Sequence, residues 1–190
     1  MKNVLMSALA AAAFAVPALA AETTTLVGCA PDNPYFKAYM GMTNEMFIPR
    51  DGMVAKKFYA DEFISHNQDR GGGTATKINV SRMEHLYEES FKTFGKRTYE
   101  NEVIICSENY VIARVAMEST MTGPMGDQPA TGKTARISAT DIYKFGKDAK
   151  VIERWGNADN VGQLWQLGLK LPPPPPGMGG AEAPKKDEKK

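Results

Sequence analysis

One strand-like stretch near the end of the chain gathers side chains that could do chemistry. In VIERWGNAD (residues 151–159), alternate positions carry Glu153, Trp155, Asn157 and Asp159. Residues two apart in a strand share a face, so we expect these side chains to point the same way. Two carboxylates and an amide beside a Trp are unusual in a dry core. The pattern favours the wall of a partly polar pocket.

The two carboxylates of this stretch are too far apart to work as a pair. Six residues of strand span about 20 Å, whereas paired glycosidase carboxylates lie no more than about 10 Å apart. Asp159 is therefore either an acid and base on its own or the N-cap of a following helix. Asn160, with Gln163 three residues later, competes for the capping role. We interpret Glu153 as structural, facing a Lys or Arg on a neighbouring strand.

The scaffold that must position these residues is a set of helices followed by strands. Apolar side chains recur at three- and four-residue spacing in 33–47 and 79–94, which predicts two amphipathic helices, with a short helical turn at 53–59. From residue 98 the period changes to two, which predicts strands at 98–106, 110–121, 134–144 and 150–158, before a helical turn at 162–169. This order predicts an α+β fold with helices on one face of an antiparallel sheet. Strongly curved around the N-terminal helices, such a sheet forms a cone that holds a small molecule.

The ends of the chain differ in composition from this domain, which we place at 33–171. Residues 1–20 carry one Lys, an apolar run and Ala-Leu-Ala, which is typical of a signal peptide cleaved after Ala20. Residues 21–32 form an N-terminal extension, and 172–190 a Pro-, Gly- and Lys-rich tail that we expect to be disordered. The sequence predicts no transmembrane segment and a periplasmic or secreted protein.

Cys29 and Cys106 are the only cysteines of the chain. In an oxidising compartment we expect them to form a disulfide. The alternative is a lipid anchor on Cys29, because Leu26-Val27-Gly28-Cys29 has the form of a lipobox. Two cysteines and two histidines so far apart give no metal-ligand spacing, so no metal or cofactor is predicted. A formal net charge of +1 without a basic stripe argues against nucleic acid as a partner.

The closing stretch resembles the signature of a known family. Val151-x-Glu153-x-Trp155-x-x-x-Asp159-x-x-Gly162, followed by Gln166-Leu167-Gly168, is similar to the end of SnoaL-like polyketide cyclase (ester cyclase) domains in the nuclear transport factor 2-like superfamily. Upstream, FYADEFISHN, Arg114, TMTG (120–123) and PATGK (129–133) resemble the family's helix end and central hairpin. The resemblance covers nearly all of 34–169 and implies the same cone-shaped fold.

The resemblance also implies a reaction and a set of site residues. Characterised members close a polyketide ring by an intramolecular aldol condensation, with an Asp as acid and base and without a metal or cofactor. By matching position this residue is Asp159, with His66 as its proton partner in the same cavity. The implied pocket residues are Trp155, Asn67, Phe63, Arg114 and Met121, the last standing where many members carry a His.

Two hypotheses follow for the function. The leading one is an exported protein that binds a small apolar molecule in its cone and acts on it through Asp159 and His66, since a carboxylate partly desolvated beside Trp155 suits enolisation chemistry. The rival is a non-catalytic binding or dimerisation module of the cell envelope, because one fold serves many functions. It predicts that Met121 packs on Trp155 and that Asp159 binds backbone amides. A homodimer fits either hypothesis.

Overall fold

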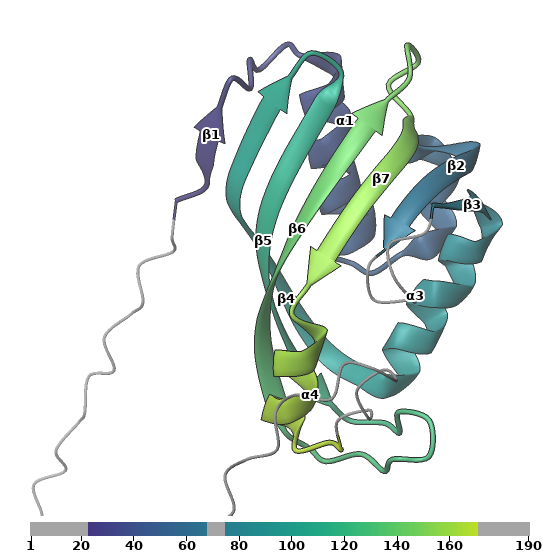
Figure 1. The fold of residues 1–190 in the computed structure, drawn as a ribbon, viewed down its shortest axis with the longest axis vertical. Helices are drawn as coiled ribbons and strands as arrows, with labels where there is room; N and C mark the ends of the chain where they lie inside the picture. The colour runs from purple at the N-terminus through teal and green to yellow at the C-terminus, as the bar shows by residue number, and fades with distance from the viewer. Residues whose placement is uncertain (1–22, 68–74, 171–190) are drawn as a thin grey trace, which may run out of the picture.

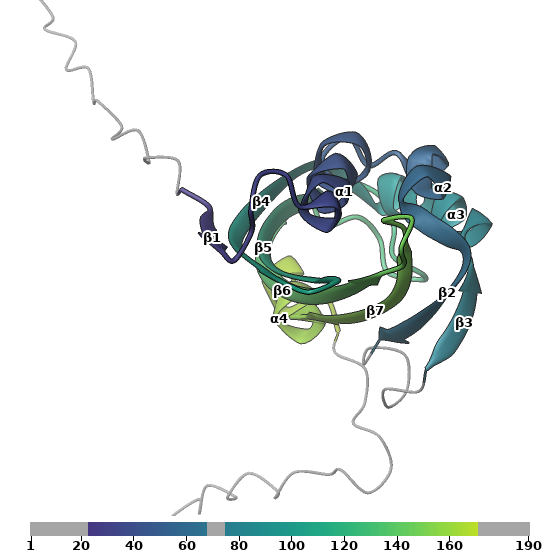
Figure 2. The ribbon, with the colours of Figure 1, turned by 90° about the horizontal axis from the view of Figure 1, so that it is seen from above.

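A curved sheet closed by helices forms the body of the protein. The computed structural model describes residues 23–67 and 75–170. Figure 1 shows the sheet, whose seven strands follow the order β1-β4-β5-β6-β7-β2-β3. Seen from above, the strands bend round, and α1, α2 and α3 close the open side (Figure 2). The predicted α+β class, with a curved sheet wrapped around N-terminal helices, is confirmed.

The helices lie where the apolar periodicity predicts them. Their bounds are α1 Pro34–Met42 with a π-helical extension η1 Thr43–Phe47, the short pair η2 Gly52–Val54 and α2 Ala55–Phe58, α3 Ser81–Thr93, and α4 Asn160–Leu167. α1 begins at Asn33, whose side-chain oxygen accepts hydrogen bonds from the amides of Tyr35 and Phe36 at 2.8 and 3.2 Å. Tyr39 and Met42 lie on the buried face of α1, one helical turn apart.

Four of the strands form the predicted antiparallel meander. They are β4 Phe94–Ser107, β5 Tyr110–Met121, β6 Thr134–Phe145 and β7 Val151–Ala158, and each pairs with the next in the antiparallel sense. Three further strands were not predicted, namely β1 Thr25–Val27, β2 Tyr59–Asn67 and β3 Thr76–Asn79. β1 pairs with β4 and β2 with β7 in the parallel sense, so the sheet is mixed near both edges.

The space between the sheet and the helices is filled mainly by aromatic rings. Burial alternates along β6, whose inward-facing residues are Ala135, Ile137, Ala139, Asp141, Tyr143 and Phe145. Tyr39 of α1 packs on Tyr143, with ring centroids 5.6 Å apart, and Phe47 of η1 lies 5.4 Å from Tyr99 of β4. Large rings of this kind contribute much of the buried apolar area of a small domain.

α4 pairs with β6 beyond the point where β7 ends. Pairing between β6 and β7 starts at Ala139 and Ala158, so the earlier part of β6 needs another partner. Gln166 of α4 accepts a hydrogen bond from the amide of Arg136 and donates one to its carbonyl, both at 3.0 Å. The end of α4 also completes a second core cluster formed by Phe94, Met121, Ala135, Leu167 and Leu169.

A disulfide between Cys29 and Cys106 ties the N-terminal segment to β4, which confirms the predicted pair. Cys29 follows β1, whose residues pair with residues 103–105 of β4, so the bridge and the strand hold the same segment. The bridge uses the sulfur atom that acylation would require. In this structure Cys29 is therefore not available for the lipid anchor considered as the alternative.

The predicted signal peptide (1–20) and the predicted tail (172–190) lie outside the described residues. Within 23–67 and 75–170, the structure contains no helix that is both long and apolar enough to cross a membrane.

Removal of the disulfide is expected to destabilise the fold. The bridge joins residues separated by 77 positions in the sequence, and such a cross-link contributes about 2–4 kcal/mol by restricting the unfolded chain. The double variant Cys29→Ser/Cys106→Ser should lose about this much free energy of unfolding in urea titrations. Dithiothreitol should lower the wild-type midpoint to the same value and leave the double variant unchanged. An unaltered midpoint in the double variant would show that the β1–β4 pairing suffices without the bridge.

Candidate functional site

A cavity of about 180 Å³ lies on the concave side of the sheet, bounded by β6 and β7 on one side and by η1 and α3 on the other. Large side chains from the strands and from the helices line it, and they include Phe47, Tyr59, Tyr99, Tyr143, Met83 and Met117. The strand wall carries the small residues Ala139, Gly156 and Ala158, which leave the space open. The charged side chains that reach this cavity are Asp141 and Arg154.

Asp141 and Arg154 form an ion pair in the wall of the cavity. Arg154 donates a hydrogen bond from Nη2 to Asp141 Oδ1 at 2.6 Å, and Asp141 is only 8% exposed. The two share a face because Asp141 is the register partner of Gly156, two residues from Arg154. Burial alone lowers the pKa of Arg154, but the charge of Asp141 and the hydroxyls of Tyr143 and Tyr59 raise it well above the ordinary value. The guanidinium therefore stays charged and can make strong, charge-assisted hydrogen bonds.

Gly156 provides the room for this ion pair. A Cβ atom at position 156 would lie 2.7 Å from Arg154 Nη2 and 2.7 Å from Asp141 Oδ1. Any larger residue would push the two charged groups apart. A glycine inside a strand often marks such a close approach.

Four tyrosines of the cavity wall surround the ion pair. Burial raises the pKa of Tyr59, Tyr87, Tyr99 and Tyr143, and the charge of Asp141 raises each further. Their hydroxyls are therefore protonated at neutral pH and can donate hydrogen bonds to an oxygen atom in the cavity.

Tyr99 is held from behind by a second tyrosine. The Tyr39 hydroxyl donates a hydrogen bond to Asn101 Oδ1 at 2.6 Å and lies 3.4 Å from the Tyr99 hydroxyl. Burial raises the pKa of Tyr39 to about 12. A chain of neutral hydroxyl groups thus runs from the helix layer to the cavity wall.

Asp159, the acid and base that the family resemblance implies, is the N-cap of α4. Its Oδ1 accepts a hydrogen bond from the Gly162 amide at 2.8 Å, so Asp159 takes the capping position for which Asn160 was the other candidate. The side chain is exposed and borders an open groove on the outer face of the sheet, together with Arg114. The contact is the one that the binding-module hypothesis predicts, and a catalytic role for Asp159 stays a prediction.

His66, Trp155 and Glu153 meet on the outer face of the sheet, opposite the cavity. The His66 ring stacks on Trp155, with centroids 4.8 Å apart and planes within 4°, and His66 Nε2 lies 2.9 Å from Glu153 Oε1. Glu153 also binds Lys144 of β6 at 3.4 Å, as predicted for a structural role. Trp155 is the register partner of His66 and lies four residues before Asp159, about 13 Å along the strand. The structure therefore does not bring His66 and Asp159 together.

A β-bulge explains why the cavity face of β7 differs from the expected one. Val151 pairs with Phe145 and is buried, whereas Glu153 pairs with Lys144, and the register shifts between these pairs. An extra residue at a bulge reverses the alternation of side chains. Val151 and Glu153 therefore point to opposite faces although they are two residues apart. The inward-facing residues after the bulge are Arg154, Gly156 and Ala158, and not the alternate set that the sequence predicted for the pocket wall.

Two of the expected pocket residues pack in the core instead of lining the cavity. Phe63 of β2 is buried in the main core, with its ring 4.8 Å from that of Tyr59. Met121 is fully buried in the second cluster with Leu167, whereas Trp155 lies on the outer face. The packing of Met121 on Trp155 that the binding-module hypothesis predicts is therefore wrong.

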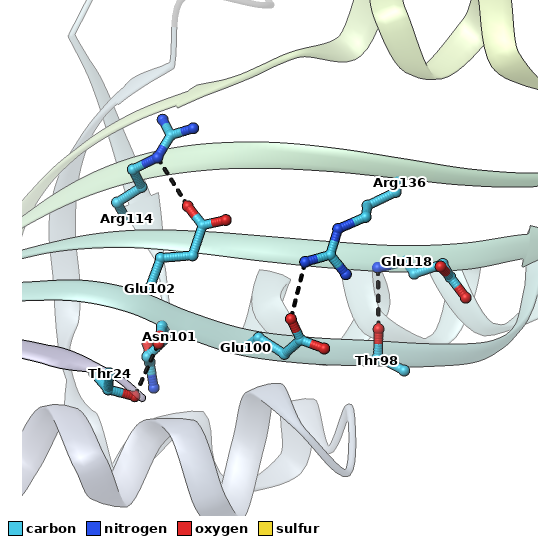
Figure 3. A network of polar contacts seen from close by, with 8 residues as sticks. All are labelled: Thr24, Thr98, Glu100, Asn101, Glu102, Arg114, Glu118 and Arg136. Carbon is cyan, nitrogen blue, oxygen red and sulfur yellow. Dashed lines mark hydrogen bonds and ion pairs between the residues drawn. The ribbon is translucent and has the colours of Figure 1, made fainter. Parts of the chain in front are cut away.

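Arg114 lies exposed on the outer face of β5, where it pairs with Glu102 of β4 at 2.8 Å. Figure 3 shows this contact beside a second cross-strand pair, Arg136 with Glu100 at 3.0 Å. Glu118 lies further along β5, and its backbone amide donates a hydrogen bond to the Thr98 hydroxyl at 3.3 Å. The Asn67 side chain lies outside the described part of the structure.

Neither Asp141 nor Arg154 was predicted from the sequence as a site residue. The available signal was the alternation along β6, because the inward set from 135 to 145 reads Ala, Ile, Ala, Asp, Tyr, Phe and contains a single charged residue. A lone carboxylate in an apolar strand face needs a buried partner. Among the residues that the structure describes, no three His, Cys, Asp or Glu side chains are arranged to hold a metal ion.

Comparisons with known proteins agree with the fold. The profile of the SnoaL-like polyketide cyclase family matches residues 37–167. No curated protein matches the chain significantly. Among solved structures, a protein from Acidithiobacillus ferrooxidans is 16% identical with a TM-score of 0.63, over 74% of this chain and 98% of its own.

Two further solved structures show the same architecture. IdmH from Streptomyces antibioticus is 20% identical with a TM-score of 0.60, over 72% of this chain and 99% of its own. A SnoaL-like polyketide cyclase from Agrobacterium tumefaciens is 18% identical with a TM-score of 0.56, over 70% of this chain and 98% of its own. Identities this low support the fold and not a shared substrate.

Replacement of Gly156 by Ala tests the packing of the ion pair. Because the new Cβ would press on both Asp141 and Arg154, we expect Gly156→Ala to lower the free energy of unfolding by about 1–3 kcal/mol, as other overpacked cores do. Urea titration measures the change. In an Asp141→Ala background the same substitution should cost clearly less, since one of the two clashing groups is gone. Equal costs in the two backgrounds would contradict this explanation of the glycine.

The outer Glu153 cluster predicts a pH-dependent contribution to stability. The hydrogen bond from His66 lowers the pKa of Glu153, burial opposes this, and Lys144 lowers it further. A lowered folded-state pKa means that the ionised group stabilises the fold above the unfolded-state pKa of about 4.3, and that this contribution is lost as the pH falls through the folded-state value. Glu153→Gln should cost about 0.2–1 kcal/mol at pH 7, allowing for solvent screening. Urea titrations at pH 7 and pH 3 should show the difference from wild type shrinking at the lower pH, and a constant difference would contradict the assignment.

Proposed function

Because the chain belongs to the SnoaL-like polyketide cyclase family, we propose that it binds a small carbonyl compound in the inner cavity and transfers a proton on it through Asp141. The observation that carries the proposal is the ion pair between buried Asp141 and partly buried Arg154, which lies in the wall of a cavity. Charged groups are rarely kept out of water without a function or a structural need.

The first step of this chemistry is removal of a proton from carbon. Asp141 Oδ2 is the atom that we assign to the transfer, since Arg154 holds Oδ1. The carboxylate takes a proton from the carbon next to a carbonyl group, and the electron pair of the broken C–H bond moves to the carbonyl oxygen as an enolate. A carboxylate is a weak base, so the C–H bond must be acidic, as it is between two carbonyl groups.

The enolate oxygen needs hydrogen-bond donors that are already in place. The tyrosine hydroxyls of the wall remain protonated because burial raises their pKa, and Arg154 adds a permanent positive charge. Donors that are already fixed in place stabilise developing negative charge without reorganisation during the reaction. The wall of the cavity therefore suits an enolate better than its neutral precursor.

The enolate can then follow either of two routes. Return of the proton from Asp141 to another carbon isomerises the compound. Attack of the enolate carbon on a second carbonyl carbon of the same molecule forms a carbon–carbon bond, and the oxygen of that carbonyl accepts the proton from Asp141. The second route is an intramolecular aldol reaction, which is the reaction class of a polyketide cyclase.

We also propose that this protein is exported from the cytoplasm. The Cys29–Cys106 disulfide supports it, since such bonds persist in oxidising compartments such as the periplasm. The apolar run near the N-terminus of the sequence, which is typical of a signal peptide, also supports export.

The assignment of the chemistry to Asp159 and His66 is the alternative within the same reaction class. The N-cap position of Asp159 and the separation of His66 on the outer face speak for Asp141 instead. A non-catalytic binding module is the second candidate function, and the capping contact of Asp159 favours it.

The test is hydrogen exchange at the acidic carbon of benzoylacetone, a one-ring compound with two carbonyl groups. In deuterated buffer, the wild-type protein should accelerate the exchange that proton NMR follows. Asp141→Asn keeps the shape of the side chain but removes the base, so it should lose about a hundredfold or more of the acceleration.

The matched control for this experiment is Asp159→Asn, because Asn caps a helix as well as Asp does. It should retain the exchange rate and the stability of wild type. Loss of exchange in Asp159→Asn with retention in Asp141→Asn would assign the chemistry to Asp159. No acceleration by the wild-type protein would favour the binding module.

A further inference from the structure

We infer that the cavity is built for a single-ring or similarly small carbonyl compound and excludes fused polycyclic molecules. This inference concerns the substrate class of the site proposed above and rests on that proposal for the location of binding. The volume of about 180 Å³ is the first observation. Engineered core cavities of about 150 Å³ bind benzene, whereas sites for drug-sized molecules reach about 300–1,000 Å³.

The strand wall of the cavity sets this volume from one side. Ala139, Gly156 and Ala158 are the small residues whose inward positions leave the space. They belong to β6 and β7, whose backbones are fixed by antiparallel pairing from Ala139 onward. The wall cannot retreat without breaking the sheet. Further room on this side would require a different strand arrangement.

The rest of the cavity wall, formed by rings of the sheet and of η1, is fixed by contacts between aromatic rings. Phe47 packs on Tyr99 at 5.4 Å and on Tyr143 at 6.4 Å between centroids, and Tyr143 in turn packs on Tyr39 at 5.6 Å. Displacement of one ring would disrupt several of these contacts, and packed interiors resist such changes. The volume is therefore a property of the packed fold, and a fused polycyclic ligand does not fit within it.

The chemistry of the wall selects among small compounds. Arg154 and the tyrosine hydroxyls offer hydrogen-bond donors, whereas Asp141 offers an acceptor that Arg154 already engages. Buried donors bind ligands that bring acceptor oxygens. Around them, Phe47, Met83 and Met117 provide apolar contact. A flat, one-ring compound with one or two carbonyl oxygens matches both properties.

The experiment compares the binding of benzoylacetone, with one ring, and dihydroxyanthraquinone, with three fused rings, by isothermal titration calorimetry. The full-length protein should bind the first and give no binding heat with the second. Comparable affinity for the three-ring compound would overturn the inference. So would failure of the one-ring compound to bind.

A matched pair of variants locates the binding site. Ala139→Leu adds a side chain to the cavity wall, and it should weaken the binding of benzoylacetone by at least about tenfold. Thr140→Leu places the same side chain on the next residue of β6, which borders the outer groove with Arg114, and it should leave the affinity unchanged. Equal affinities in wild type and Ala139→Leu, with both proteins folded by circular dichroism, would overturn the inference.

The variant Met117→Ala enlarges the cavity and so tests the size limit in the opposite direction. It shortens a side chain of the cavity wall and should permit the three-ring compound to bind. Two negative results together would show that the cavity is not a binding site. They are no binding of benzoylacetone by wild type and no binding of dihydroxyanthraquinone by a folded Met117→Ala variant.

These binding results are separable from the proposed chemistry. Tight, size-selective binding without hydrogen exchange would leave the inference standing and reject the proton transfer by Asp141. Hydrogen exchange that survives Ala139→Leu unchanged would instead place the reaction outside this cavity and reject the inference.

Discussion

The structure depends on a charged pair, Asp141 with Arg154, that lies largely inside a curved sheet. Removing two ions from water costs several kcal/mol per ion, which is recovered only when their geometry is good and other hydrogen bonds are satisfied. Here the geometry comes from three independent sources. The register of β6 and β7 places Asp141 and Arg154 on one face, Gly156 leaves room for their contact, and the aromatic layer from α1 and η1 covers them. The cavity is the space that remains beside this pair.

The two faces of the sheet have different physical tasks. The concave face carries rings, methionines and the Asp141–Arg154 pair, which together line the cavity. The convex face carries cross-strand ion pairs, such as Glu102 with Arg114 and Glu100 with Arg136 (Figure 3). Exposed pairs of this kind stabilise a fold only slightly, but they keep this face polar.

The residues of the closing family signature have structural contacts in this protein. Glu153 binds His66 and Lys144, and Trp155 stacks on His66. Asp159 caps α4 through the amide of Gly162, where a Cβ would lie 2.1 Å from the Asp159 carboxylate. The Gln166 side chain makes the two hydrogen bonds to the backbone of Arg136 in β6 that a neighbouring strand would otherwise make. These residues thus fix how β7 ends and how α4 docks, and they lie away from the cavity.

The sequence by itself determined the local structure, because apolar period, turn residues and caps act over a few residues. It predicted the long helices, the four-stranded meander and the disulfide, and its family signature implied the cone. It did not determine β2, whose alternation is broken by a register shift between Tyr59 and Ile64. It also could not assign the faces of β7, because the bulge near residue 152 reverses the alternation only when Val151 pairs with Phe145. Only the tertiary structure decided that Arg154 and not Trp155 faces inward, since strand register depends on contacts between segments far apart in the chain.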